Sequence, residues 1–412
     1  MPNYQEECEV LIIGAGPAGT LAAAKLLRLG HDVTILERSS FPRFVIGESL
    51  LPRCQDLLAE TDLLSAVNKS NFQIKNGAVF ASDNEECHFD FSERYSEGAD
   101  FAWQVERSKF DKVLADEVAK KGAQVQYRCT VKNVDFLEGH QIVQYENNEG
   151  KQLSVKSKYV IDASGFGRVL PRMLNLDKPS IHPPRAAVFA HAEVFDGEYR
   201  KDSIEVFCLS NDSWCWLIPL SKSKLSIGVV GAINDLADLP GDAEEKLRSQ
   251  IDENKTLRTK VGNYRFVSPV NEIKGYAIGV KQFYGRGYVL TGNSTEFIDP
   301  IFSSGVTLAM ESGVQAAKLV SSTLNNIEVN WEKDYVEYIQ RGVSVFSSYI
   351  KAWYSGELPQ IFFASHQLEQ FKKQICSVLA GYVWDTTNPM VTKHEKILST
   401  LSKVIKIQQS ED

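Results

Sequence analysis

The sequence predicts an α/β fold with three parts: a Rossmann-like domain, an inserted antiparallel β-sheet domain and a helical C-terminal region. Three observations support this prediction. A glycine motif at residues 14–19 lies between a short apolar run and an Ala/Leu-rich segment. Short apolar segments joined by polar turns occupy residues 203–230, and the chain after Trp331 has a helical, aromatic-rich pattern. Alternating strands and helices indicate a parallel sheet, whereas closely spaced short strands indicate an antiparallel one.

The composition is that of a folded protein without a surplus of positive charge. The 412 residues include 45 Lys+Arg and 53 Asp+Glu, a net charge of −8, and 43% of them are hydrophobic. These values exclude a disordered or fibrous chain and argue against a nucleic-acid partner, because no positive surplus is present to neutralise phosphates. No apolar run approaches the ~20 residues that span a bilayer, so we expect no transmembrane segment. The acidic N-terminus is unlike a signal or transit peptide.

The cysteines and histidines predict neither disulfides nor a metal site. The 7 cysteines are scattered and include no C-x-x-C pair, which favours reduced thiols and a cytoplasmic location. The 7 histidines are equally dispersed. The sequence therefore offers no set of ligands for a metal ion.

The first forty residues predict a βαβ unit. Residues 9–13 form an apolar run of the kind that is buried in parallel sheets, and residues 33–36 form a second one. An Ala/Leu-rich helix is predicted between them over residues 20–29, and Gly30 ends it. The motif G-x-G-x-x-G lies at the turn between the first strand and the helix.

Each residue type in this turn has a physical role. Gly14 permits the tight turn, Gly16 lets a pyrophosphate approach the backbone, and Gly19 allows the helix to pack closely on the strand. The helix N-terminus supplies free N–H groups for the phosphates. Glu37 closes the second strand, where an acid can accept both hydroxyls of an adenosine ribose. The unit therefore predicts a dinucleotide site.

Two later strands also end in glycine-rich turns. Residues 158–162 lead into an Ala-Ser-Gly turn, and residues 288–291 lead into Gly292, which a helix over residues 306–321 follows. The carboxyl ends of parallel strands share one edge of a sheet, where open α/β sheets bind ligands. Convergence with residues 14–19 suits a long two-part cofactor better than NAD alone. The start of the later helix offers N–H groups to the far end of that cofactor, or to an anion beside it.

These motifs resemble those of the FAD-dependent monooxygenase superfamily that shares the hydroxybenzoate-hydroxylase fold, and within it those of the flavin-dependent halogenases. The superfamily pattern is matched by residues 14–19 with Glu37, by I-G-E-S-L-L-P at residues 46–52, by Arg107 and by D-A-S-G at residues 162–165. Two motifs are specific to halogenases, W-x-W-x-I-P at residues 214–219 and the lysine Lys75. The resemblance extends to about residue 345, and the tail is a softer match.

The resemblance implies FAD as the cofactor, a halide ion (chloride or bromide) and an aromatic small molecule as substrate. Reduced FAD and oxygen would oxidise the halide to hypohalous acid, which Lys75 would hold, hydrogen-bonded or as a haloamine, and pass to the ring. A haloamine needs a neutral amine, so Lys75 is expected to be buried. Trp214 and Trp216 lie two apart on a strand, face the same side and would form a wall between flavin and substrate. The expected cofactor-binding residues are Gly14, Gly16, Ala18, Gly19, Glu37, Glu48, Ser49, Arg107, Asp162, Asn293 and Pro300, the halide-binding residues are Ser304 and Gly305, and Phe302 joins the tryptophans in the wall.

Two departures from the family pattern bear on the site. Tryptophan halogenases carry a glutamate where this chain has Phe302, whereas halogenases of phenols and pyrroles lack it because those rings are already activated. The substrate is therefore expected to be a phenol, resorcinol or pyrrole-like ring, free or on a carrier protein. Superfamily members usually have Gly-Asp where this chain has Gly292-Asn293, and asparagine can hydrogen-bond the ribityl chain only without a charge.

The motif positions predict a discontinuous FAD-binding domain, with the other parts inserted in it or following it. Its segments are residues 1–75, 107–182 and 272–330, the substrate domain is residues 76–106 and 183–271, and the cap is residues 331–412. No second dinucleotide motif is visible, so a partner flavin reductase is expected to deliver reduced FAD. Three alternatives stay open on the same fold: a flavin monooxygenase or hydroxylase, a polyene or prenyl reductase, and a flavin-binding module without catalysis. Lys75 and the two tryptophans favour the halogenase.

Overall fold

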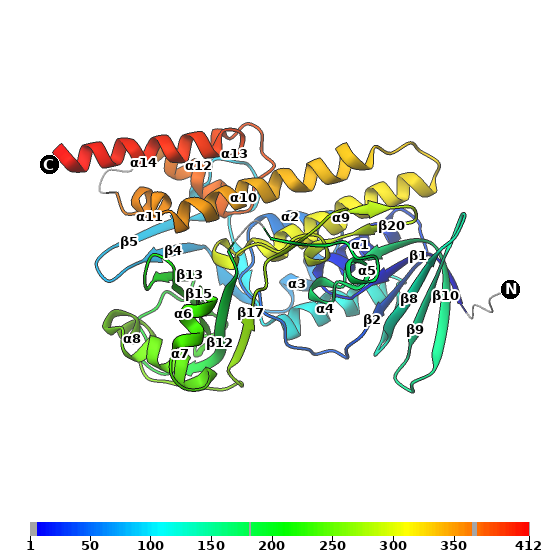
Figure 1. Ribbon diagram of the computed structural model, residues 1–412, viewed down its shortest axis with the longest axis horizontal. Coiled ribbons are helices and arrows are strands. Elements are labelled where there is room, and N and C mark those ends of the chain that lie inside the picture. The colour runs from blue at the N-terminus through cyan, green and yellow to red at the C-terminus, as the bar shows by residue number, and fades with distance from the viewer. Residues whose placement is uncertain (1–5, 181–182, 365–368, 412) are drawn as a thin grey trace.

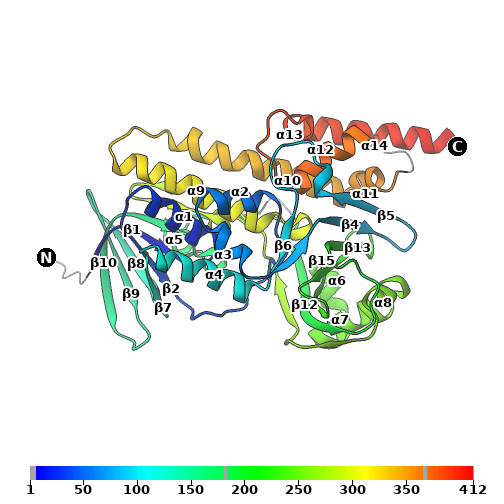
Figure 2. The ribbon, with the colours of Figure 1, turned by 180° about the vertical axis from the view of Figure 1, so that it is seen from behind.

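The computed structural model describes residues 6–180, 183–364 and 369–411, so His182 and His366 lie outside the described residues (Figure 1). Two large β-sheets lie side by side along the long axis of the molecule, and helices from the last part of the chain run along one side of both (Figures 1 and 2). This arrangement confirms the predicted α/β class.

The first sheet contains the Rossmann-like part. Its strands are β1 (Glu6–Ile13), β2 (Val33–Glu37), β7 (Gln124–Tyr127), β8 (Thr130–Phe136), β9 (Gln141–Glu146), β10 (Gln152–Asp162), β19 (Tyr284–Gly285) and β20 (Tyr288–Leu290). They run in the order β19-β20-β10-β1-β2-β7, and β9 joins β10 to β8. In the parallel core of this sheet Ile13 lies beside Asp162, and Asp162 beside Leu290. The three glycine-ended strands therefore meet at one edge, as the sequence predicted.

The second sheet is mainly antiparallel. Its strands are β4 (Gly77–Ala81), β5 (Glu86–Asp90), β12 (Arg185–Val194), β13 (Ser203–Cys208), β14 (Trp214–Pro219), β15 (Lys224–Ala232), β16 (Tyr264–Phe266) and β17 (Asn271–Lys274). They run in the order β16-β12-β15-β14-β13-β4-β5, with β17 beside β12. The predicted meander is present as β13, β14 and β15. One pair departs from the antiparallel pattern, since β13 runs parallel to β4. β4 comes from a separate, earlier segment, and only a long connection can make a parallel pair.

The helices form three groups around these sheets. Those of the first sheet are α1 (Pro17–Arg28), α2 (Arg53–Glu60), α3 (Leu64–Asn68), α4 (Arg107–Lys120), α5 (Val169–Met173) and α9 (Ser304–Leu324). One side of the second sheet carries α6 (Ile233–Asp238), α7 (Ala243–Asp252) and α8 (Lys255–Val261), and the cap is α10 (Tyr338–Tyr354), α11 (Glu357–Phe362), α12 (Glu369–Leu379), α13 (Pro389–Thr392) and α14 (His394–Glu411) (Figure 1). Among the described residues, every helix is too short or too polar to cross a membrane.

The second sheet separates two apolar cores because its side chains alternate between its faces. Phe80 and Trp214 pack with cap residues such as Phe346, whereas Val79 packs on the other face with residues such as Leu247 of α7. A third core lies under the first sheet, around β1, α1 and α9. The cavity described below opens between these bodies.

Two small strand pairs lie near the predicted domain boundaries. β3 (Gln73–Lys75) pairs with β6 (Ala102–Gln104), and β11 (Asp177–Pro179) pairs with β18 (Ile278–Val280). The predicted boundary between residues 271 and 272 falls inside β17, which belongs to the second sheet. The division of the chain into three domains stays a prediction.

Candidate active site

A cavity of about 510 Å³ lies between the two sheets. At the first sheet it is lined by the turns that follow β1, β10 and β20. At the second sheet it is lined mainly by apolar side chains. The lining residues at this second end include Ala187, Ile204, Trp214, Trp216, Ile218, Ile273 and Tyr276.

The glycines of the first turn differ in what they permit. Gly14 has φ +101°, and a Cβ on it would lie 2.6 Å from the Ala163 carbonyl oxygen. A Cβ on Gly19 would lie 2.0 Å from the Gly14 carbonyl oxygen. These two positions therefore need glycine for the fold itself. At Gly16 the nearest protein atom would be the Arg43 Nη2, at 3.6 Å, so the space in front of this residue belongs to the cavity and is open to a pyrophosphate.

Glu37 is held firmly at the cavity wall. One carboxylate oxygen accepts the Ala15 N–H at 2.9 Å, and the other accepts the Ser39 N–H at 2.9 Å. Arg43 Nε lies 3.6 Å from the carboxylate. Each carboxylate oxygen offers two acceptor sites. Positions therefore remain for the two ribose hydroxyls that the sequence predicts this residue to bind.

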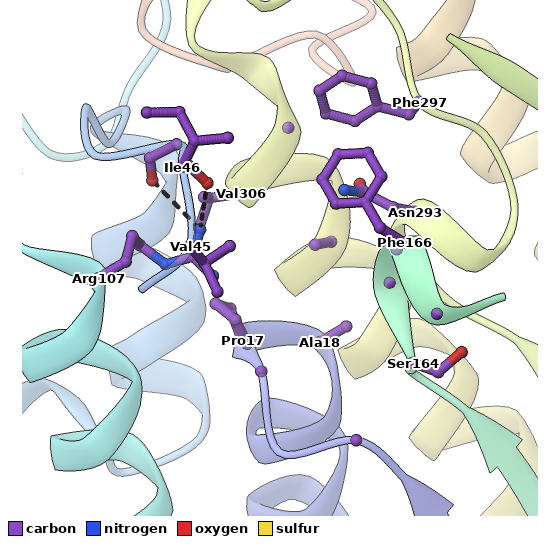
Figure 3. Close-up of a pocket in the computed structure, with 18 of the residues that line it drawn as sticks. Pro17, Ala18, Val45, Ile46, Arg107, Ser164, Phe166, Asn293, Phe297 and Val306 are labelled. Atoms are coloured by element: carbon purple, nitrogen blue, oxygen red, sulfur yellow. Dashed lines mark hydrogen bonds between the residues drawn. The ribbon is translucent and has the colours of Figure 1, made fainter. Parts of the chain in front are cut away.

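Arg107 begins α4 and fixes the loop that enters the cavity (Figure 3). Its guanidinium donates to the Ile46 and Gly47 carbonyl oxygens at 3.1 and 3.3 Å. It also forms a bidentate ion pair with Asp111, at 2.7 and 3.0 Å. Asp111 was missed at the sequence level, although its position four residues after Arg107 on a helix could have indicated the pair.

Asp162 is buried where the turns after β10 and β20 meet. Its carboxylate accepts the N–H groups of Ser164 and Leu170 at 2.8 and 2.7 Å, and the Ser294 hydroxyl at 3.0 Å. Asp162 therefore joins these two turns, and Ser164 and Gly165 beside it line the cavity. A contact of Asp162 with the cofactor stays a prediction.

Asn293 lines the cavity beside two aromatic rings. Figure 3 shows it with Phe166 and Phe297, across the cavity from Val45 and Ile46. The two rings meet edge to face, with centroids 5.0 Å apart. The Asn293 backbone carbonyl accepts Arg168 Nη1 at 2.8 Å, which fixes the turn and leaves the side-chain amide available to a ligand.

The start of α9 has the properties of an anion site. Ser303 adopts a left-handed conformation (φ 57°) just before this 21-residue helix, and Gly305 lines the cavity. The Ser304 hydroxyl is buried and has no partner within the described part of the chain. Free N–H groups at a helix start carry a partial positive charge. Pro300, predicted to face the flavin, also lines the cavity.

The two tryptophans of β14 lie on the cavity side of the second sheet. Trp214 and Trp216 have ring centroids 6.0 Å apart, and both line the cavity. The prediction that they face the same side is confirmed. Trp214 Nε1 donates to the Tyr354 hydroxyl at 2.9 Å, and Trp216 Nε1 donates to the Ser226 hydroxyl at 3.2 Å. Both rings are therefore fixed in orientation.

Lys75 ends β3 and is buried, with 1% of its surface exposed. Its Nζ donates to the Leu50 carbonyl oxygen at 2.8 Å and lies 5.3 Å from the centre of the Phe91 ring. Burial lowers the pKa of Lys75 from 10.5 to about 7. The expected burial is confirmed. Lys75 lies behind the cavity wall, because its partner Leu50 directly follows Ser49, which lines the cavity.

Phe302 belongs to an aromatic cluster beneath the cap, and Pro300 and Ser303 of the same turn line the cavity. The place of Phe302 in the wall between flavin and substrate stays a prediction. Its ring centroid lies 6.1, 6.2 and 6.3 Å from those of Phe80, Tyr349 and Trp353. The buried Tyr349 hydroxyl has no partner in the described part of the chain. We use the name aromatic cluster for Phe80, Phe89, Phe302, Tyr349, Trp353 and Phe362.

A buried hydrogen-bond partner of Glu48 was also missed at the sequence level. His191 Nε2 lies 2.8 and 3.0 Å from the two carboxylate oxygens of Glu48, which lines the cavity. The Phe44 ring packs on the His191 imidazole, at 5.7 Å between centroids. The two partners are 143 residues apart, so no local pattern could reveal them.

Comparison with known proteins establishes the family. The model of the tryptophan halogenase family matches residues 9–97 and 87–359. A 1H-pyrrole-2-carbonyl-[peptidyl-carrier protein] chlorinase of Pseudomonas fluorescens is 27% identical over 98% of this chain and 94% of its own length. A sulochrin halogenase of Aspergillus terreus is 30% identical over 76% of this chain and 63% of its own length.

Solved structures agree with the fold. A flavoprotein/dehydrogenase from Cytophaga hutchinsonii has a TM-score of 0.95 at 44% identity, covering 98% of this chain and all of that one. The flavin-dependent brominase Bmp2 has a TM-score of 0.84 at 22% identity, with the same coverage of both chains. The chain belongs to the tryptophan halogenase family, which is a family of flavin-dependent enzymes. The predicted family, fold class and FAD-dependent halogenase type are thereby confirmed.

The residues of the cavity fit FAD. The open backbone at Gly16 suits the pyrophosphate, the fixed carboxylate of Glu37 suits the ribose, and the N-terminus of α9 suits the polar edge of the isoalloxazine or an anion beside it. Among the residues that the structure describes, no group of three or more His, Cys, Asp or Glu side chains could hold a metal ion.

Proposed function

We propose that this protein halogenates an electron-rich aromatic ring through hypohalous acid that Lys75 receives and passes on. When bound and reduced, FAD supplies, with oxygen, the two-electron oxidant for the halide. The observation that supports the proposal is the burial of Lys75 directly behind the cavity lining. Its Nζ contacts Leu50 next to the cavity lining, and its other neighbour is Phe91, which packs in the same core as the aromatic cluster.

The halide is proposed to bind at the start of α9, beside Ser304 and Gly305. The protein carries a net charge of −8, so the attraction must be local, and unpaired N–H groups of the helix provide it. Thr307 in the same helix contacts Cys54 at 3.2 Å, and Cys54 follows the Leu50 segment that holds Lys75. The helix that begins at the proposed halide site and the lysine therefore both contact the short segment 50–54.

Buried polar groups line the way from the cavity to Lys75. The Ser49 hydroxyl and both polar atoms of the Gln104 side chain lack a partner within the described part of the chain. Ser49 and Gln104 are bridge partners, and Gln104 lies on β6, the strand paired with that of Lys75. Unpaired buried polar atoms are costly unless a water or a ligand satisfies them. We propose that hypohalous acid passes along these groups.

At Lys75 a neutral amine can take the halogen from hypohalous acid and release water. The N–halogen bond then breaks as the ring carbon takes the halogen, and the amine recovers the proton that the ring loses. A pKa of about 7 makes the neutral amine abundant at neutral pH. Hydrogen-bonded hypohalous acid could also be delivered without this covalent step, and both routes need the buried amine.

The ring is proposed to bind in the aromatic cluster beneath the cap. Aromatic side chains suit an aromatic substrate, and the unpaired Tyr349 hydroxyl is available to a phenolic O–H or a pyrrole N–H. Phe302 stands where an acid would assist a less activated ring, which supports an electron-rich substrate. The substrate is a phenol, resorcinol or pyrrole-like ring, free or on a carrier protein as the name of the Pseudomonas fluorescens relative describes for that enzyme.

We also propose that a separate flavin reductase supplies reduced FAD, and that the protein works in the cytoplasm. The described fold uses its glycine-turn edge for one dinucleotide. The cysteines are scattered along the chain without a C-x-x-C pair, in keeping with a reducing compartment.

The test uses the purified chain with FAD, a flavin reductase, NADH, oxygen and bromide or chloride. Resorcinol, phenol and pyrrole-2-carboxylate derivatives are offered, and products are analysed by mass spectrometry. We expect a product with the halogen isotope pattern that disappears when the halide is omitted. A product that gains one oxygen would support a hydroxylase instead, and reduction of a polyene or prenyl compound would support a reductase. Either result without any halogenated product would overturn the proposal.

A further inference from the structure

Another buried acid, Asp299, lies next to the cavity wall and is used by none of the steps above. It directly precedes Pro300, which lines the cavity, and only 3% of its surface is exposed. One carboxylate oxygen accepts the Ile301 N–H at 3.1 Å. The other accepts the Tyr354 hydroxyl at 2.9 Å and the Tyr276 hydroxyl at 3.5 Å. Two tyrosines therefore share one carboxylate oxygen.

The groups around Asp299 come from four separate segments. Arg185 of β12 places Nε 3.9 Å from the carboxylate and its guanidinium carbon 3.4 Å above the Tyr354 ring. Arg185 is held in turn by Asp212, at 2.6 and 3.1 Å. Tyr354 of α10 receives the Trp214 Nε1 hydrogen bond at 2.9 Å. These contacts fix the carboxylate and leave Tyr276 as its link to the cavity, because Tyr276 lines it.

Oxidation of a halide by a peroxide-level oxidant consumes a proton. The balance is X⁻ + ROOH + H⁺ → HOX + ROH: the halide loses two electrons, the O–O bond breaks, and an oxygen–halogen bond forms. The proton ends on the oxygen that leaves. At neutral pH a general acid that faces the reacting oxygen speeds such a step. The polar groups proposed above to guide hypohalous acid are neutral hydroxyl and amide groups. Glu48, which also lines the cavity, has both carboxylate oxygens in contact with His191.

We propose that Tyr276 donates this proton into the cavity and that Asp299 replaces it. The Tyr276 O–H passes its proton to the leaving oxygen, and the protonated Asp299 carboxyl passes its own to the Tyr276 oxygen. Asp299 acts through Tyr276, so it is a positioning residue and a proton store. This inference rests on the proposed function, because it concerns formation of hypohalous acid in the cavity.

The pKa shifts of Asp299 and Tyr276 are consistent with a proton store and a proton donor. Burial raises the pKa of Asp299 from 3.8 to about 6, although hydrogen bonds from Tyr354 and Ile301 and the charge of Arg185 act in the opposite direction. Burial, together with the nearby Asp299 carboxylate, raises the pKa of Tyr276 well above 10.0. Tyr276 therefore keeps its proton until a transfer, and the protonated fraction of Asp299 falls as the pH rises through about 6.

The experiment compares Tyr276→Phe and Asp299→Asn with the wild type, using monochlorodimedone to trap hypohalous acid and a peroxidase assay to measure released peroxide. We expect trapped hypohalous acid per oxygen consumed to fall at least about 10-fold in both variants, with a matching rise in peroxide. Asp299→Glu should recover part of the yield. In the wild type the yield should fall as the pH rises above about 6, and in Asp299→Asn it should be low and flat.

Tyr199→Phe is the matched control, because Tyr199 is a buried tyrosine packed in the core on the far face of the second sheet. FAD absorbance checks that each variant is loaded. A readout without flavin comes from carbon-13 NMR of aspartate-labelled apoprotein, in which one carboxyl should titrate near pH 6 and be absent in Asp299→Asn.

The outcomes separate two failures. A wild type that oxidises no halide overturns the proposed function and this inference together. A wild type that traps hypohalous acid while Tyr276→Phe and Asp299→Asn keep its yield and pH profile overturns only the proton path.

Discussion

The cavity and the aromatic cluster are built in opposite ways. The cavity, about 510 Å³, is framed at one end by glycine turns and backbone groups. The cluster is filled by side chains, with ring centroids as close as 4.7 Å between Phe80 and Phe362. The cofactor site is therefore preformed, whereas a substrate ring can enter the aromatic cluster only if protein rings move or rotate. Substitutions in the glycine turns should therefore affect cofactor binding in the cavity, and substitutions of the ring side chains should affect substrate binding in the aromatic cluster.

The largest expected effect is on the rate of ring halogenation when Lys75 is substituted. Lys75→Ala should lower ring halogenation by roughly 100- to 10,000-fold, because the amine that carries or orients the halogen is lost. Flavin binding and oxygen consumption should stay near wild type, and hypohalous acid should escape to a trapping reagent. Liquid chromatography with mass spectrometry measures the ring product.

Lys69→Ala serves as the control, since Lys69 is exposed and close in sequence. Ring halogenation by Lys75→Ala at the wild-type rate would remove the proposed role of this residue.

Two glycines test whether the frame of the cavity serves the fold or the cofactor. Gly16→Val should raise the dissociation constant of FAD by roughly 10- to 100-fold, because the new methyl groups occupy open cavity space. Its melting temperature without flavin should change little. Gly14→Val should instead lower the melting temperature of the apoprotein, because Gly14 has φ +101° and touches Ala163. Flavin titration by fluorescence and differential scanning calorimetry measure the two quantities, and identical behaviour of both variants would contradict this distinction.

The pH dependence of halogen transfer should report the Lys75 amine. The pKa of about 7 predicts that ring product per trapped hypohalous acid rises about tenfold from pH 6 to pH 8, as the amine becomes neutral. Dividing the yield of ring product by the yield of trapped hypohalous acid removes the pH dependence of halide oxidation, because that step affects both yields equally.

The lowered pKa of Lys75 also makes the free energy of unfolding depend on pH, in a direction that can be predicted. The folded pKa lies below the unfolded value of 10.5, so between about pH 7 and that value the unfolded chain binds more protons at Lys75. This group therefore makes the free energy of unfolding increase with pH in that window. Urea denaturation of the wild type and Lys75→Met at several pH values measures the difference, and equal slopes would contradict the shift.

The smallest expected effect is in the aromatic cluster. Tyr349→Phe should raise the free energy of unfolding by about 1 kcal/mol, because it removes a buried hydroxyl that has no partner in the described part of the chain. It should also raise the KM for a phenolic ring a few-fold. Tyr335→Phe is the matched comparison: its hydroxyl donates to the Leu290 carbonyl oxygen, so this variant should be less stable than the wild type. Urea denaturation measures both, and a loss of stability in Tyr349→Phe would mean that the hydroxyl has a partner.

The sequence predicted the frame of the cavity better than its contents. The βαβ unit could be predicted because its glycines and Glu37 lie close together in the sequence and each has one physical role. The convergence of three strand ends followed from the rules of parallel sheets. The hydrogen bonds of Asp162 could not be predicted, because the partners of its carboxylate, Leu170 and Ser294, come together only once the turns are folded.

The side-chain networks were beyond reach for the same reason. Asp299 contacts Arg185, Tyr276 and Tyr354, which come from three distant segments. The family resemblance placed Phe302 in the wall between flavin and substrate, but it did not show that the turn at residues 300–302 directs the Phe302 ring into the aromatic cluster. The direction of a single side chain in a tight turn is not encoded in the motif around it.

The strand order of the first sheet also has a consequence for biosynthesis. β10 is flanked by β1 from the start of the chain and by β20, which ends at Leu290. Contacts that are far apart in sequence form late, after the intervening chain exists. On the ribosome, the nascent protein can fold its first βαβ unit early, yet the third turn of the flavin cavity is missing until well past the middle of translation. Loading with flavin must therefore follow synthesis of α9, and a prematurely terminated product would expose the unpaired edge of β10 to aggregation.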